Sequence, residues 1–211
     1  MDNHSNASIG KRGPGNMKKA IIFGAVALAY GAWSASPALS ACSEPESGCR
    51  TALKSILILK DNGDDTKDKL IFKWIKGQAT SQADFGVPTG TTNYELCVYA
   101  GTAETLIAQY AATASATLWT ALSDKGYKYK DLTGASDGIQ KIILKGGAAD
   151  KAKTLVKGKG ANLPDPTLGD LPLPVLAQLV NDDPSGACFE GEYELADVIK
   201  NDASQFKAKA Q

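Results

Sequence analysis

The sequence predicts an all-β protein, an antiparallel β-sandwich of jelly-roll or immunoglobulin-like type, and three observations lead to that fold class. Short runs of β-branched and aromatic residues recur along the body of the chain at the spacing expected of sandwich strands. Clusters of Gly, Pro, Asn and Asp separate these runs and predict turns. Between residues 55 and 194, no segment sustains the 3.6-residue periodicity of an amphipathic helix.

The first strands are indicated by two kinds of apolar run. Residues 55–60 (SILILK) form a short continuous run, which is typical of a strand buried on both faces. Residues 61–68 (DNGDDTKD) are turn formers. Residues 69–76 (KLIFKWIK) and 93–100 (NYELCVYA) each alternate two sets of side chains, so each predicts a strand with two distinct faces.

The later segments continue the same pattern, with one ambiguous stretch. Residues 105–116 are rich in alanine, which allows a helix, although the neighbouring segments favour a strand. Further strands are predicted at residues 127–131, 139–144, 152–157, 174–180 and 188–193. The tail has the spacing of a short amphipathic helix, with a frayed chain end as the alternative, on Leu195, Val198, Ile199 and Phe206.

The N-terminal segment has the layout of a secretory signal peptide. Met17, Lys18 and Lys19 form a positive start, residues 20–33 form an apolar run, and residues 34–41 are mostly small. The apolar run is shorter than the ~20 residues that a membrane-spanning helix needs, so we favour cleavage over a retained membrane anchor. The expected domains are then a leader or misassigned start (1–16), the signal peptide (17–41), a cysteine loop (42–54), the sandwich (55–194) and the tail (195–211).

Four cysteines follow the signal peptide, namely Cys42, Cys49, Cys97 and Cys188. An even number of cysteines in an exported chain indicates disulfides, and no C-x₂-C spacing suggests zinc. Cys42 also fits a lipobox, but its acylation would leave three cysteines. We therefore expect a secreted, periplasmic or cell-surface protein rather than a lipoprotein. Of the three possible connectivities, we expect Cys42–Cys49 and Cys97–Cys188.

The charge balance and the scarcity of His exclude several function classes. The full sequence holds 23 basic and 23 acidic residues and one His. The four basic residues and one acidic residue before position 42 leave 19 basic and 22 acidic residues, a net charge of −3, and no His or Met. This composition excludes Ser-His-Asp and Cys-His catalysis and His-ligated metals. It also argues against a nucleic-acid partner, and we expect neither an enzyme nor a cofactor.

Three groups of residues are candidate ligand sites. Trp119, Tyr127 and Tyr129 can stack on sugar rings if they are exposed, because Tyr127 and Tyr129 share one strand face; the alternative is that all three belong to the core.

The acidic loop is a weaker candidate for Ca²⁺, which takes six to eight oxygen ligands, and its alternative is a solvated turn crowded by lysines. Its carboxylates belong to Asp61, Asp64, Asp65 and Asp68.

A basic stretch in the middle of the chain is a third candidate. It can contact anionic polysaccharide, lipid head groups or nucleic acid, or its lysines can simply keep strand edges from aggregating. Its members are Lys125, Lys128, Lys130, Lys141, Lys145, Lys151, Lys153, Lys157 and Lys159.

From residue 55 to about residue 193 the chain resembles a group of uncharacterised exported bacterial proteins of deltaproteobacterial type. Several short motifs carry the resemblance: residues 56–74 (ILILKDNGDDTKDKLIFKW), 86–89 (GVPT), 96–99 (LCVY), 126–131 (GYKYKD), 138–143 and 157–160 (KGKG), with Trp119 and Cys188. The resemblance implies an extracellular β-sandwich, and that group has no established activity.

These observations favour a non-catalytic secreted or cell-surface module with a surface, matrix or adhesion role. A polysaccharide or an envelope component is the expected partner, and a homo-oligomer fits as well. The first alternative is a carbohydrate-binding domain or weak glycan-active enzyme that uses Trp119 and Tyr127. The second alternative is a subunit of an extracellular polymer that assembles through a strand edge.

Overall fold

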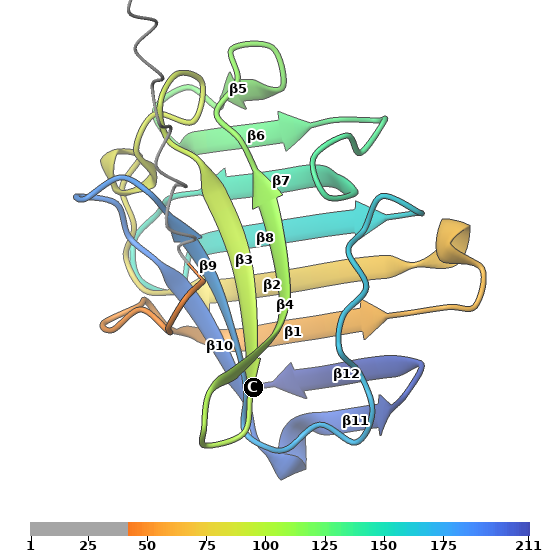
Figure 1. Cartoon of the computed structure of the whole chain (residues 1–211). Coiled ribbons are helices and arrows are strands. Elements are labelled where there is room, and N and C mark those ends of the chain that lie inside the picture. Colours follow the sequence, from red (N-terminus) through yellow and green to blue (C-terminus); the bar gives the residue numbers. More distant parts are fainter. Residues whose placement is uncertain (1–41) are drawn as a thin grey trace, which may run out of the picture. The chain divides into compact units, whose positions relative to one another are not determined.

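The computed structural model describes residues 42–211, so the expected leader (1–16) and signal peptide (17–41) lie outside the described residues. Within them the protein is all-β, with twelve strands in two antiparallel sheets, which confirms the β-sandwich (Figure 1). The strands are β1 (Ala52–Lys60), β2 (Lys69–Gly77), β3 (Tyr94–Ala100), β4 (Thr105–Ala112), β5 (Trp119–Ala121), β6 (Gly126–Lys130), β7 (Ile139–Lys145), β8 (Ala152–Lys159), β9 (Val175–Asn181), β10 (Phe189–Tyr193), β11 (Val198–Asp202) and β12 (Gln205–Ala210).

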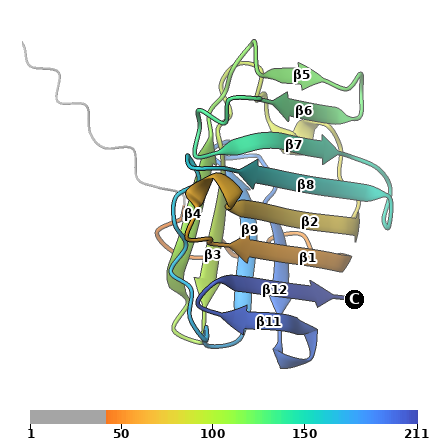
Figure 2. The ribbon, with the colours of Figure 1, turned by 90° about the vertical axis from the view of Figure 1, so that its right-hand side faces the viewer.

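The two sheets differ in size. The large sheet has eight strands in the order β11-β12-β1-β2-β8-β7-β6-β5, and the small sheet has four in the order β10-β9-β3-β4. Figure 2 shows the large sheet as a stack of strands with β3, β4 and β9 behind it. The ambiguous residues 105–116 contain β4, which pairs with β3 across a bulge between Val98 and Tyr99. The neighbouring strands therefore prevail over the helix propensity of alanine.

The core lies between the sheets and follows from period-two alternation. In β2, Leu70, Phe72 and Trp74 point inward and are buried. The last residue of the strand, Gly77, has to be a glycine because a Cβ there would collide with the Trp74 indole. Residues 55–60 were expected to be buried on both faces, and this is wrong. Leu57 and Leu59 are fully buried, whereas the alternate isoleucines are only partly buried on the outer face of the large sheet.

The tail, residues 195–211, is neither a helix nor a frayed end. After a single 3₁₀ turn at Leu195–Asp197 it forms β11 and β12, and β12 pairs with β1 along its length. The helical interpretation is wrong because the decisive pattern has period two: Phe206 and Ala208 are buried between lysines that face outward. The tail is thus part of the sandwich.

Residues 42–50 form a strap over the outer face of the small sheet. Two disulfides hold it, Cys42–Cys97 to β3 and Cys49–Cys188 beside β10, so the expected Cys42–Cys49 and Cys97–Cys188 pairs are wrong. The strap does not close on itself but runs along the sheet, and the Gln178 side chain of β9 bonds to both the backbone N–H and the C=O of Glu46.

We expect Phe206→Ala to lower the free energy of unfolding by about 3–5 kcal/mol, because it leaves a cavity where β12 closes the core. Urea denaturation measures the change. Lys207→Ala, on the adjacent outward-facing position, is the matched control and should change stability by less than about 0.5 kcal/mol. Similar effects of the two substitutions would contradict the docked β12.

We expect peptide mapping without reduction to recover Cys42 linked to Cys97 and Cys49 linked to Cys188. Replacing each pair by Ser should destabilise the protein by about 4 kcal/mol for the 55-residue separation and about 5 kcal/mol for the 139-residue separation in the chain-entropy model. A peptide that joins Cys42 to Cys49 would contradict the strap.

Candidate functional site

The outer face of the large sheet is covered by lysines and has no acidic residue on six of its strands. Alternation that points the core residues inward points these side chains to solvent, and β1, β2, β6, β7, β8 and β12 contain no Asp or Glu. We call this surface the lysine face; it consists of Lys54, Lys60, Lys69, Lys73, Lys128, Lys130, Lys141, Lys145, Lys153, Lys157, Lys159, Lys207 and Lys209.

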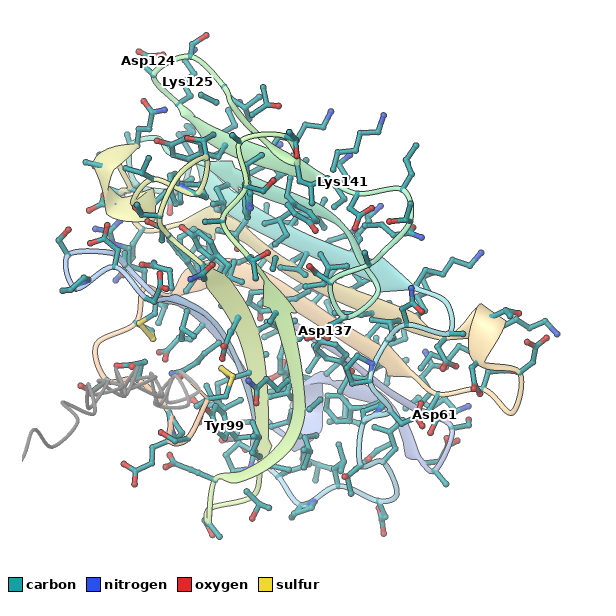
Figure 3. The ribbon with its side chains drawn as sticks, turned by 45° about the horizontal axis from the view of Figure 1, so that its top comes forward. Asp61, Tyr99, Asp124, Lys125, Asp137 and Lys141 are labelled. Atoms are coloured by element: carbon teal, nitrogen blue, oxygen red, sulfur yellow. A yellow bond between two sulfur atoms is a disulfide. The ribbon has the colours of Figure 1, made fainter. Side chains whose placement is uncertain are left out.

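Strand register places many of these lysines directly opposite one another. Lys69 of β2 lies between Lys60 of β1 and Lys159 of β8. Lys141 of β7 lies between Lys157 of β8 and Lys130 of β6, and Lys141 is labelled in Figure 3. Like charges at directly opposite positions destabilise a sheet. Among residues 42–211, the three ion pairs are Arg50–Asp84, Lys67–Asp64 and Lys200–Asp202, so none neutralises this face.

An apolar floor lies between the lysines. Its side chains occupy the remaining outward positions of the central strands and are half-buried, and long lysine stems can cover such surface while their ammonium groups stay in water. These residues are Ile56, Ile58, Ile71, Ile75, Ile143 and Leu155.

Three shallow hollows open on the lysine face. The first, of about 310 Å³, lies over the ends of β2 and β8 and is lined by Lys67, Lys69, Lys157 and Lys159 among others.

The second hollow, of about 240 Å³, lies over β6 and β7 and is lined by Lys128, Lys130, Leu132, Gln140, Lys141 and Lys157. The third, of about 200 Å³, is lined by Lys73, Ile75, Ile143, Lys153, Thr154 and Leu155. Each hollow brings at least two lysine ammonium groups together with aliphatic side chains. This combination suits an anionic group that is carried on an otherwise uncharged ring or chain.

Charge is segregated between the two sheets. The four strands of the small sheet contain no Lys or Arg, and their charged residues are Glu95, Glu190 and Glu192. The strap adds Glu44 and Glu46 on the same side. A chain of nearly balanced composition therefore presents a strongly positive surface on one sheet.

Sequence reasoning identified the lysine face in part. Seven of the nine lysines of the basic middle stretch belong to it, while Lys125 and Lys151 lie in turns. The contributions of β1, β2 and β12 were missed, although lysine alternates with apolar residues in KLIFKWIK and QFKAKA. That alternation is the signal that would have found them.

The aromatic candidates are core residues, and their interpretation as exposed sugar-stacking groups is wrong. Trp119 is 2% exposed, Tyr127 9% and Tyr129 0%. The Trp119 ring packs against those of Tyr94 and Tyr129, at centroid distances of 5.5 and 5.2 Å, and its Nε1 donates to the Thr113 carbonyl. The alternation that puts Tyr127 and Tyr129 on one face puts that face inward.

The acidic loop is only partly assembled into a cluster. Asp64 accepts from Thr66 and pairs with Lys67 at 2.8 Å, and Asp65 lies in the exposed 3₁₀ turn. Carboxylate oxygens of Asp61 and Asp68 instead come within 4.8 Å of one another and of Asp165, which sequence reasoning missed because it lies about 100 residues further on. This oxygen cluster has the chemistry of a cation site. The Asp61 side chain is labelled in Figure 3.

The Asp68 carboxyl is nearly fully buried and accepts from the Asn62 N–H at 2.7 Å. Burial raises its pKa above the usual value, and the negative charges of Asp61, Asp65 and Asp165 act in the same direction.

Other carboxylates with shifted pKa values stabilise turns or link the strap to the rest of the fold. The Arg50 guanidinium holds the pKa of Asp84 well below its usual range, and this pair links the strap to the 3₁₀ turn Ala83–Phe85. Hydrogen bonds from Ser204, together with Lys200, lower the pKa of Asp202 to about 2. Hydrogen bonds from Thr133 lower the pKa of Asp131, whose other oxygen accepts from Ala135. Each of these carboxylates is therefore ionised at neutral pH.

A fourth hollow, the largest of those described here at about 420 Å³, lies between the strap and the β9–β10 turn, and its acidic lining residues are Glu46, Asp182 and Asp183. Asp182 accepts two hydrogen bonds from Asn93, and Asp183 accepts two from Ser185, so both carboxylates take part in turn structure.

No protein-family model, curated protein or solved structure matches this chain. Within residues 42–211, no helix has the length and apolar character that crossing a membrane requires.

We expect Asp68→Asn to raise the stability of the protein at pH 7 in the presence of a chelator. A carboxyl whose folded-state pKa is raised destabilises the fold while ionised, so wild-type stability rises as pH falls through that pKa. The difference in stability between the Asp68→Asn variant and the wild-type protein should therefore become smaller as the pH falls. Thermal unfolding between pH 3 and pH 7 measures it.

Asp64→Asn is the control for this prediction, because its pKa is lowered by Lys67 and Thr66 and the substitution should not stabilise. A less stable Asp68→Asn protein at pH 7 in chelator would contradict the expectation. Repeating the series in millimolar Ca²⁺ tests whether the oxygen cluster binds a cation.

Proposed function

We propose that this protein is a non-catalytic exported binding module that attaches to an anionic component of the cell envelope or extracellular matrix through the lysine face. The observation that carries the proposal is that every charged side chain on this face is positive. The six strands that form it contain fourteen lysines and no acidic residue. Thirteen of these lysines belong to the face, and several of them lie directly opposite one another. An anionic partner removes the repulsion that this arrangement creates.

Protection of strand edges does not account for these lysines. Edge lysines prevent pairing with another chain only where a strand has a free side. In the large sheet the edge strands are β11 and β5, whereas β1, β2, β8 and β7 are interior and carry most of the lysine face. A solvated sheet face needs polar groups, but both signs of charge would serve that purpose with less repulsion.

Export is supported by the cysteines. Both disulfides require an oxidising compartment to persist, and residues 17–41 have the signal-peptide pattern. The Sγ atom of Cys42 is bonded to Cys97, so it is not available for the thioether of a lipoprotein. A free secreted or periplasmic protein therefore fits better than a lipid-anchored one. The resemblance to exported bacterial proteins points to the same compartment.

The alternatives lose support at the residues they need. Sugar stacking by Trp119 and Tyr127 needs exposed rings, and these rings are buried. Polymer assembly through strand edges needs free backbone groups. At β10 the strap supplies Arg50, whose carbonyl accepts from Glu190. At β4, the other edge of the small sheet, the Asp137 carboxylate accepts from the Ala111 N–H.

The test is retention on an anionic matrix, with heparin–agarose as the probe. Because residues 42–211 carry a net charge of −3, net charge cannot account for retention at 0.15 M NaCl. We expect wild-type protein to be retained, and the triple variant Lys73→Gln, Lys141→Gln and Lys153→Gln to elute at much lower salt.

The matched control is the triple variant Lys76→Gln, Lys125→Gln and Lys151→Gln, which removes the same charge outside the lysine face. It should elute close to wild type. Equal losses in the two triple variants, or no retention of wild type at 0.15 M NaCl, would overturn the proposed function.

A further inference from the structure

We infer that the ligand of the lysine face is a chain-like acidic polysaccharide that lies across β2, β8, β7 and β6, with Lys157 as its central contact. The inference rests on the proposed function and specifies the ligand class. Three features of the face carry it: the adjacency of two hollows, the chemistry of their walls and floor, and the absence of exposed aromatic rings on the described surface of the large sheet.

The first two hollows are adjacent. Lys157 and Gln140 line both, so one side of the Lys157 position faces β2 and the other faces β7 and β6. Register confirms this central place, because Lys157 lies between Ile71 of β2 and Lys141 of β7. Neighbouring strands are about 5 Å apart, so a ligand reaching from β2 to β6 spans about 15 Å. A single small anion occupies one hollow, whereas a chain of several sugar units occupies both.

The walls and floor suit an acidic sugar chain. Ammonium groups stand at the rim, where they meet carboxylate or sulfate groups, and Gln140 adds an amide that can exchange hydrogen bonds with hydroxyls. The floor is aliphatic, with Ile71 in the first hollow and Leu132 at the edge of the second, and it offers contact to the C–H faces of sugar rings. Leu132 is 76% exposed, which makes it the most accessible apolar side chain bordering these hollows.

Other polyanions fit this surface less well. A bilayer would be engaged best by several apolar side chains that protrude beyond the lysines, but among residues 42–211 Leu132 is the one exposed apolar residue that lines these hollows, and the floor isoleucines are half-buried. Single-stranded nucleic acid is held by aromatic platforms, and the aromatic rings of β2, β5, β6 and β12 are all buried. Both remain as outcomes that the experiment distinguishes.

A chain that enters successive hollows gains affinity with length, because each later contact is intramolecular. The probes are galacturonic acid, its dimer and its hexamer, with binding to the full exported protein measured by calorimetry at 50 mM and 150 mM NaCl. We expect the hexamer to bind at least about 100-fold more tightly than the monomer, which is well beyond the sixfold statistical gain.

The residue test compares two single substitutions of equal charge. Lys157→Gln should weaken hexamer binding about fivefold or more, as expected for an ammonium group near an anionic partner. Lys209→Gln, on exposed β12 of the same face but outside the three hollows, should change it less than twofold. Unchanged thermal unfolding of both variants confirms that they are folded.

The outcomes distinguish failure of the proposed function from failure of the polysaccharide inference. Failure of wild-type protein to bind heparin–agarose overturns the proposed function itself. Retention on heparin with hexamer binding no tighter than sixfold over the monomer, or equal effects of Lys157→Gln and Lys209→Gln, overturns only the chain across the hollows. Tighter binding to phosphatidylglycerol vesicles or to single-stranded DNA than to polygalacturonate also overturns it, and assigns the face to that class instead.

Discussion

The whole molecule depends on the antiparallel ladder from β12 through β1, β2 and β8 to β7. Because successive residues of a strand point to opposite faces, this ladder sends Leu57, Phe72 and Val156 into the core and sends the lysines between them to solvent. A register slip of one residue would bury lysines and expose the core, so the burial of these apolar side chains fixes both faces at once. The lysine face is in this sense the reverse side of the core.

The small sheet and the strap complete the fold and separate the charges. The strap covers Cys97, Tyr99 and Val180, which form a second buried cluster on the outer side of the small sheet. The Tyr99 hydroxyl donates to the Glu44 carbonyl, and Figure 3 shows Tyr99 near the disulfides that hold the strap. Covering this side of the sandwich leaves the lysine face as the broad uncovered sheet surface of residues 42–211. The acidic residues of the strap and of β10 then lie on the opposite side from the lysines.

The lysine face also shows why a net charge can conceal a surface of the opposite sign. A net charge of −3 spread evenly would repel an anionic polymer, but the distance over which ions screen charges is about 8 Å at physiological salt. An anionic ligand lying on the large sheet therefore responds mainly to the lysines beneath it. The balanced composition shows that the chain as a whole is not a polycation. One of its faces is nevertheless strongly positive.

Alternation of side chains along each strand, together with the turn formers, was enough to predict the all-β sandwich, because period two is a local property of sequence. The same local information left the tail ambiguous, since the alternation at Phe206 and Ala208 is short and competes with a helical spacing that starts at Leu195. Pairing of β12 with β1 decides between the two patterns. It also could not choose the disulfides, because Cys42 and Cys49 are close in sequence while the strap carries each to a different distant strand.

The sequence by itself therefore determined the class of fold, the absence of His from residues 42–211, and the lysines of one central stretch. Only the tertiary structure decided which face of each strand meets the core. In the folded protein Trp119, Tyr127 and Tyr129 are buried. Asp165 lies close to Asp61 and Asp68, and lysines from six strands lie on one surface. The physical reason is that strand order and register join segments far apart in the chain, and no local pattern carries that information.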